Sequence, residues 1–141
     1  MKVKKIIKKF CKEFGVKAKK GNCWEAFEDE VHYPAPKKYT SEGFMELIER
    51  NYPDVKATEF TWSLLHEIGH TQTWGYFDNF EWLEYAMKAP EVYDIDEYYE
   101  IPQEKAATDW AYEFIKEYPE VVAKLEKKMR KALREKGYNL V

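Results

Sequence analysis

Cysteine, histidine and long apolar runs are all scarce in this chain of 141 residues, which contains two cysteines and three histidines. The two thiols, Cys11 and Cys23, are not spaced as a CxxC pair, so they are predicted to be free in a reducing compartment rather than part of a disulfide framework. Lysines interrupt the apolar residues throughout positions 1–10, which leaves no stretch suited to a secretion signal or a membrane span. These absences predict a cytoplasmic protein without a membrane partner.

An excess of basic charge is also missing. The formal net charge is −3 at pH 7 although 35% of the residues are charged, so direct binding to nucleic acid is not expected. The apolar share of 45% supports a globular fold, and neither an internal repeat nor a linker-like stretch divides the sequence. Residues 1–141 are therefore predicted to form a single domain around one core.

The periodicity of the apolar residues predicts an α+β fold. A helix over residues 3–14 is expected to lead into a small antiparallel sheet of about three strands. The expected strands cover residues 16–19, 23–28 and 31–33. A mainly helical body should follow, with helices at residues 41–51, 79–88 and 102–118, one that begins at Pro119, and one that Thr58 or Thr61 caps.

The sequence His66-Glu67-Ile68-Gly69-His70 is the most informative motif. A helix advances about 3.6 residues per turn, so the two histidines lie one turn apart on the same face and can bind one metal ion. Glu67 lies about 100° around the helix from His66, close enough to reach a water molecule beside the metal without ligating the ion. The motif therefore predicts two zinc ligands, His66 and His70, and a general base, Glu67, of a hydrolase.

A catalytic zinc ion needs a third protein ligand, and histidine does not supply it downstream of the motif. The only other histidine is His32, which we expect to be structural. The extended motif of the metzincin class requires glycine at residue 73 and histidine at residue 76, where this chain has Thr73 and Tyr76. That class is excluded, and the remaining candidates are carboxylates.

Glu104 is the leading candidate for the third ligand. It begins a stripe in which Ala107, Thr108 and Ala111 follow at i+3, i+4 and i+7, and these small residues would allow two helices to approach closely. A close approach is what the glutamate needs to reach an ion held by the facing helix. The rival ligands are Asp94, Asp96 and Asp109.

The residues of this stripe resemble a known signature. From Glu104 to Ala111 the sequence EKAATDWA is similar to the E-x-x-A-[ND]-x-F-A motif of the ImmA/IrrE-type metallopeptidases, whose first motif commonly reads HE[LI]GH. The resemblance covers roughly residues 58–116 and is specific at the two motifs, with minigluzincin-like small metallopeptidases as a close competitor. It implies a gluzincin with one catalytic zinc ion and a specific partner protein as substrate, such as a helix-turn-helix repressor.

The chain departs from the signature at two positions, with Thr108 in place of Asn or Asp and Trp110 in place of Phe. The group that orients a ligand histidine is therefore expected to be Thr108 or Asp109. Gluzincins often use a downstream tyrosine or histidine to stabilise the oxyanion of the transition state. In this chain the candidates for this oxyanion donor are Tyr93, Tyr98 and Tyr99.

These features together predict a zinc metallopeptidase that hydrolyses a peptide bond with a metal-activated water and Glu67 as general base. The resemblance also implies an edge strand beside the active-site helix, near Val31 to Tyr33, that pairs with an extended substrate. The alternative is a catalytically silent or latent metal-binding protein that acts as a partner-binding module. A fourth protein ligand, such as Cys23 or an aspartate, would favour that alternative.

Overall fold

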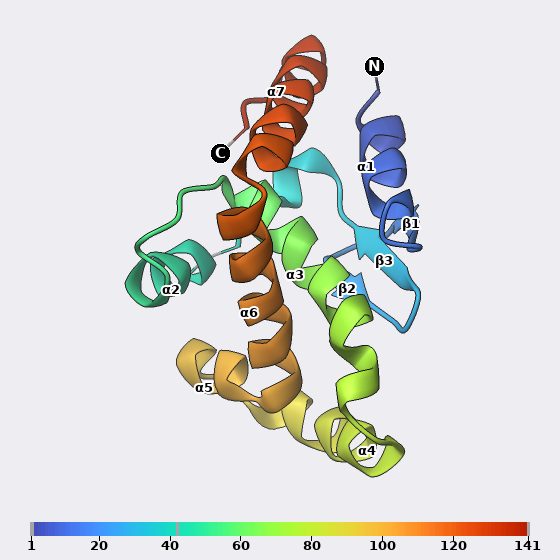
Figure 1. Cartoon of the computed structure of the whole chain (residues 1–141), viewed down its shortest axis with the longest axis vertical. Coiled ribbons are helices and arrows are strands. Elements are labelled where there is room, and N and C mark those ends of the chain that lie inside the picture. The colour runs from blue at the N-terminus through green and yellow to red at the C-terminus, as the bar shows by residue number, and fades with distance from the viewer. Residues whose placement is uncertain (1, 42, 141) are drawn as a thin grey trace.

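A computed structural model describes residues 2–41 and 43–140 of the chain (Figure 1). Within these residues short strands near the N-terminus are followed by a mainly helical body, which is the predicted α+β class. The α-helices are α1 (Val3–Lys12), α2 (Phe44–Asn51), α3 (Glu59–Thr73), α4 (Asn79–Lys88), α5 (Ile95–Glu100), α6 (Pro102–Glu117) and α7 (Pro119–Glu135). The strands are β1 (Lys17–Lys20), β2 (Glu25–Ala26) and β3 (Glu30–Tyr33), and the 3-10 helices are η1 (Pro36–Lys38), η2 (Trp74–Tyr76) and η3 (Ala89–Glu91).

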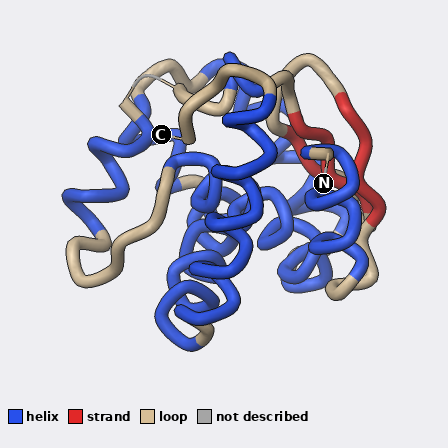
Figure 2. The backbone as a smooth tube through the Cα atoms, turned by 90° about the horizontal axis from the view of Figure 1, so that it is seen from above, coloured by secondary structure: helices blue, strands red, loops and turns tan. Residues whose placement is uncertain are grey.

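Helices α3 and α6 run side by side through the centre of the molecule (Figure 1). The sheet packs on α3 through β2 and β3, and the strands lie together at one side of the otherwise helical fold (Figure 2). Helices α1 and α7 occupy one end of the long axis, and α4 and α5 occupy the other (Figure 1).

The sheet is mixed, so the prediction of an antiparallel sheet is wrong for one of its two pairings. The strand order is β1-β3-β2, with β1 parallel to β3 and β2 antiparallel to it. Val31 and Tyr33 of β3 are buried, which explains why this strand takes the centre with a neighbour on each side. The edge strand beside α3 is consequently β2, and not the segment from Val31 to Tyr33 as predicted.

Helix α3 is fixed at its N-terminus by two separate groups. The side chain of Thr58, one of the two predicted caps, accepts a hydrogen bond from the backbone N–H of Thr61 at 3.2 Å. The buried carboxylate of Glu126 on α7 accepts bonds from the Thr58 backbone N–H at 2.8 Å and from the Thr61 hydroxyl at 2.5 Å. A negative charge at this end also suits the helix dipole, so α7 holds the helix that carries the motif.

The predicted apolar faces of the outer helices are buried. On α7 the inward residues are Val122, Leu125, Met129 and Leu133. On α1 the core residues include Cys11, which is a free thiol, as is the exposed Cys23. No helix in residues 2–41 or 43–140 combines the length and the apolar character needed to cross a membrane.

Candidate metal centre

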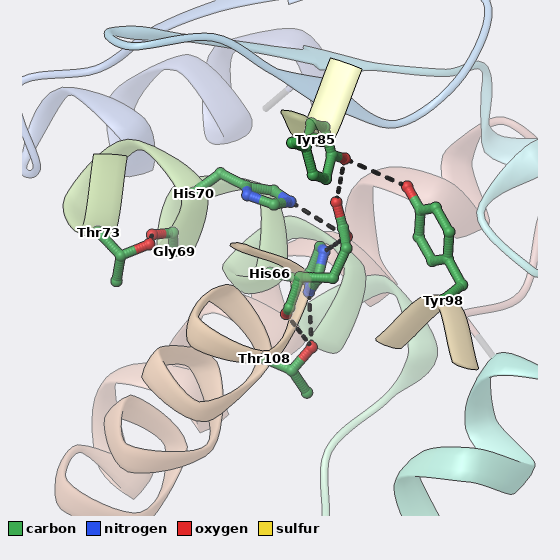
Figure 3. A network of polar contacts seen from close by, with 8 residues as sticks. His66, Gly69, His70, Thr73, Tyr85, Tyr98 and Thr108 are labelled. Carbon is green, nitrogen blue, oxygen red and sulfur yellow. Dashed lines mark hydrogen bonds and ion pairs between the residues drawn. The ribbon is translucent and has the colours of Figure 1, made fainter. Parts of the chain in front are cut away.

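The structure brings His66, His70 and Glu104 together in its interior (Figure 3). One potential ligand atom from each lies within 4.8 Å of the other two, and all three residues are buried. Oε1 of Glu104 is 2.9 Å from Nε2 of His66 and 3.2 Å from Nε2 of His70. The two imidazoles come from successive turns of α3 and the carboxylate from the first turn of α6, so this buried group could hold one metal ion.

The close approach of α3 and α6 places the carboxylate within reach of the imidazoles. Ala107 and Ala111 on α6 are fully buried, as the stripe of small residues predicted. The opposing residue on α3 is Gly69, where a Cβ atom would lie 2.5 Å from the carbonyl oxygen of Ala107. The absence of a side chain at Gly69, which the sequence analysis did not consider, is therefore as important to the contact as the alanines.

Thr108 orients the ring of His66, one of the two predicted possibilities. Its hydroxyl donates to the backbone carbonyl of Glu104 at 3.0 Å, so its oxygen is left to accept from Nδ1–H of His66 at 2.9 Å. Nε2 of a neutral His66 then carries a lone pair that points at the carboxylate of Glu104. Two acceptor atoms that face each other repel unless a positive charge lies between them, and a metal ion would supply that charge.

Asp109, the other candidate for this role, does not belong to the site. Its carboxylate accepts a hydrogen bond from the Tyr52 hydroxyl at 2.6 Å and pairs with Lys105 at 3.6 Å. Thr108 faces α3, so Asp109, one position later on the same helix, points in a different direction and cannot orient a histidine. Trp110 instead stacks on Phe114 in the aromatic packing beneath α1.

The rival third ligands also have other partners. Asp94 caps α5 by accepting from the backbone N–H of Glu97 at 3.0 Å, and Asp96 pairs with Arg50. Among the described residues, neither aspartate joins the histidines in a potential metal-binding group. Glu104 is thus the carboxylate that the fold delivers to the two imidazoles.

The charges of the three residues are strongly coupled. Burial would raise the pKa of Glu104, but hydrogen bonds and charge from His66 and His70 outweigh burial and hold this pKa far below its ordinary value. Burial would lower the pKa of His70, yet the carboxylates of Glu104 and Glu67 outweigh it and raise this pKa. The site therefore favours an ionised Glu104 carboxylate with positive charge on an imidazole beside it.

Glu67 is buried beside the three potential ligands, and all four residues line one cleft. Burial raises its pKa above the ordinary glutamate value, and the nearby His66 and His70 offset part of this shift. A carboxylate with a raised pKa is a stronger base than an exposed one. The environment of Glu67 suits proton transfer.

The potential metal-binding group lies in a cleft of about 830 Å³. One wall comes from β2 and its neighbours, with Trp24, Glu25 and Phe27. The opposite wall comes from η2 and α4, with Trp74 and Trp82 stacked at 3.9 Å between their ring centroids. A cleft of this size between an edge strand and an aromatic wall has room for a peptide segment.

Three tyrosines approach the potential metal-binding group, and two of them were predicted candidates for the oxyanion donor. These two, Tyr98 and Tyr99, line the cleft, and the Tyr99 ring lies 5.6 Å from that of His66. Tyr93 does not line the cleft, since 93% of its surface is exposed, and it is removed from this role. Tyr85 on α4 was missed, although its hydroxyl donates to Oε2 of Glu104 (Figure 3).

The tyrosine hydroxyls keep their protons at neutral pH. Burial raises the pKa of Tyr98 to about 12, with a further contribution from the charge of Glu104. The pKa of Tyr85 is also raised by burial and by Glu104, and its hydroxyl lies 3.4 Å from that of Tyr98 (Figure 3). Tyr85 therefore donates to the predicted ligand Glu104, and Tyr98 is a second hydrogen-bond donor in the same cleft. Nothing in the sequence distinguished Tyr85 from the other aromatic residues around it.

His32 is held in the sheet by two carboxylates, consistent with the structural role expected for it. Its Nδ1 is 3.0 Å from Glu25 and its Nε2 is 2.7 Å from Glu30. The hydrogen bond with Glu30 raises the pKa of His32, and the smaller opposing effect of burial does not cancel it. Because this folded pKa is raised, the stabilisation is complete below the ordinary value of 6.5 and is lost as the pH rises through the folded value.

The titration of His32 can be followed by NMR, and we expect its midpoint to lie above 6.5, the ordinary value. Glu30→Gln should lower the midpoint because the largest stabilising partner of the imidazolium loses its charge. Glu28→Gln, an exposed neighbour in the β2–β3 turn, is the matched control and should leave the midpoint in place. An unchanged midpoint in Glu30→Gln would show that the pair does not form in solution.

No protein-family model, curated protein or solved structure matches this chain. The likeness to ImmA/IrrE-type metallopeptidases at the two motifs accordingly stays a prediction.

Proposed function

We propose that this chain is a zinc-dependent endopeptidase of the gluzincin type. The observation that carries the proposal is the convergence of His66, His70 and Glu104 within 4.8 Å of one another, at the floor of a cleft that Glu67 also lines. Two imidazoles and one carboxylate form one of the ligand sets of catalytic zinc sites, in which a fourth position stays open for water or substrate. A general base beside such a set is the arrangement that hydrolysis needs.

The residues of the cleft divide the reaction among them. His66, His70 and Glu104 would hold the ion, which when bound supplies positive charge to acidify water and polarise the carbonyl of the substrate. Glu67 accepts the proton as the water oxygen attacks the carbonyl carbon, and it returns a proton to the nitrogen as the C–N bond breaks. The hydroxyl of Tyr98 would donate to the carbonyl oxygen as it becomes negative, while Tyr85 donates its single proton to Oε2 of Glu104 and so orients this ligand.

The alternative of a structural metal site is less well supported by the ligand set. Structural zinc sites are usually closed by four protein ligands. In the described part of the chain, Cys23 and the aspartates do not join the group of three, although Cys23 lines the same cleft. Three protein ligands would leave one position on the ion open, which favours a catalytic site over a purely structural one.

The natural substrate is proposed on the resemblance of the two motifs alone. ImmA/IrrE-type enzymes act on a specific partner protein, and a helix-turn-helix repressor is the kind of substrate that such a likeness suggests. Because β2 and α4 contribute opposite walls of the cleft, a peptide segment would enter between them to reach Glu67. An internal segment of a protein would fit this description if it were extended or locally unfolded.

Metal analysis of the purified chain tests the ligand set before any substrate is known. We expect the parent protein to bind about one zinc ion per chain, as for a three-ligand site with one open position. Glu104→Ala should lose the ion because two imidazoles alone hold it weakly, and peptide hydrolysis should disappear with it. Glu100→Ala, which removes an exposed glutamate from the neighbouring helix α5, should retain both metal and activity.

Two results would contradict the proposal. Retention of zinc by Glu104→Ala at the affinity of the parent would place the third ligand elsewhere. A fully zinc-loaded parent that cleaves no member of a diverse library of unfolded peptides and proteins would remove the peptidase function while leaving the metal site intact.

A further inference from the structure

Helix α4 has an apolar face that the core does not use. No residue of this helix is buried. Phe80, Leu83 and Met87 lie at i, i+3 and i+7 and are exposed to 77%, 57% and 69%. This spacing puts the three side chains on one side of the helix, where they form an apolar strip in contact with water. Contiguous exposed apolar surface of this kind marks an interaction site.

The opposite side of α4 is firmly attached. Asp78 and Glu81 form a capping box at its N-terminus. The ring of Trp82 stacks on Trp74, and its Nε1–H donates to the Trp74 carbonyl at 3.1 Å. Gln103 on α6 donates to the backbone carbonyl of Glu81 at 3.0 Å. The apolar strip is therefore presented on an anchored helix and is ready to bind without prior ordering.

The strip is continuous with the cleft. Ala86 is exposed and lines the cleft together with Trp82 and Tyr85. It is also three residues from Leu83, so it lies beside the strip on the helix surface. A polypeptide that leaves the cleft over the rim formed by α4 would meet the apolar strip next.

The charge around the strip selects the partner. Residues 78–91, which form α4 and its flanks, contain a single lysine, Lys88, and four carboxylates. These carboxylates are all exposed: Asp78, Glu81, Glu84 and Glu91. Such a field attracts a cationic segment and repels an acidic one, and it also opposes the pairing of two copies through this same face.

We propose that α4 forms an exosite, built from Phe80, Leu83 and Met87 with the surrounding carboxylates, that binds a cationic amphipathic helix in the substrate protein. The inference rests on the proposed function, because it places the exosite beside the cleft where the same substrate is cut. The substrate helix lays its apolar residues on the strip while its lysines and arginines face the carboxylates. The exosite thereby gives selectivity to a cleft whose aromatic walls alone would accept many sequences.

A synthetic peptide tests the docking step without cleavage. The probe is a fluorescent amphipathic helix with leucines on one face and lysines elsewhere, titrated by anisotropy into zinc-loaded Glu67→Gln protein. The triple variant Phe80→Ser, Leu83→Ser, Met87→Ser in this background should bind about tenfold more weakly or worse, because central apolar contacts dominate such interfaces. All three positions are exposed, so the fold and the zinc content should be unchanged.

Matched controls separate this surface from general stickiness. Val121→Ser with Tyr138→Ser removes two other exposed apolar side chains, one in the first turn of α7 and one just after its end, and should leave the affinity unchanged. Glu84→Lys should weaken binding of the lysine probe, and a probe with glutamates in place of lysines should not bind. A probe that binds the triple variant as tightly as the parent overturns the exosite, as does a parent that self-associates through these three residues instead of binding the probe.

The exosite and the peptidase function fail in different ways. If the probe docks on α4 but no peptide is ever cleaved, the surface stands as a binding site and its role in substrate selection is overturned. If cleavage occurs, the triple variant should raise KM for a substrate that carries the cationic helix and leave kcat unchanged. A short peptide that only fills the cleft should be cleaved equally by both proteins, and an equal KM for the long substrate overturns the exosite alone.

Discussion

Glu67→Gln should keep its zinc ion and lose peptide hydrolysis by about 10²–10⁴-fold, the usual contribution of a general acid–base group. Glutamine has nearly the same shape as glutamate, and residue 67 is not among the residues that converge as ligands. The substitution therefore removes the proton acceptor while the ligand set stays complete. The decisive measurement is kcat with zinc content determined on the same sample.

The environment of Glu67 explains why the loss should be large. Burial raises the pKa of this carboxyl group, which makes the ionised form a better base than a glutamate in water. An amide at this position neither accepts nor returns the proton. Activity should not recover at higher pH, because the missing step is a transfer through the side chain.

A second substitution in the same cleft controls for the loss of charge. Glu25→Gln also removes one carboxylate from the cleft lining, but Glu25 lies on the edge strand β2 and pairs with His32 of the central strand β3. We expect this variant to change kcat far less than Glu67→Gln does. Comparable losses in the two variants would mean that the negative potential of the cleft matters, and that Glu67 is not the base.

The part of the site that the sequence predicted depends on helical periodicity. The spacing of His66 and His70 fixes their common face before the fold is known, and the small residues after Glu104 identify the helix face that approaches them. Thr58 as the cap of α3 and Pro102 and Pro119 as the first residues of α6 and α7 follow from equally local rules. These features need no knowledge of distant contacts.

The features that escaped prediction are those that only tertiary structure decides. The six residues of α5 are too short to leave a clear periodic signal, and the strand predicted over residues 23–28 pairs only at Glu25 and Ala26. The parallel pairing of β1 with β3 and the identity of the edge strand both depend on which strand takes the centre of the sheet. Tyr85 was one of many aromatic residues until the path of α4 brought its hydroxyl to Glu104.

Gly69 is where the fold and the site depend on the same contact, so its substitution should affect both. A Cβ atom there would lie 2.5 Å from the carbonyl oxygen and 3.1 Å from Cα of Ala107, and these backbone atoms cannot turn aside as a side chain can. Gly69→Ala should therefore force α3 and α6 apart. We expect a loss of about 1–3 kcal/mol in the free energy of unfolding, as for other overpacked interiors, measured by urea denaturation of the metal-free protein.

The sign of this change is informative because alanine is the better helix former by about 1 kcal/mol. Without the close contact, Gly69→Ala would stabilise α3, so a stabilised variant would show that the helices do not touch here. Gly75→Ala is the control, since nothing lies within 4 Å of a Cβ atom at that position. Zinc affinity should fall about tenfold or more in Gly69→Ala alone, as when the groups that position metal ligands are lost, because the movement that relieves the clash draws Glu104 away from His66 and His70.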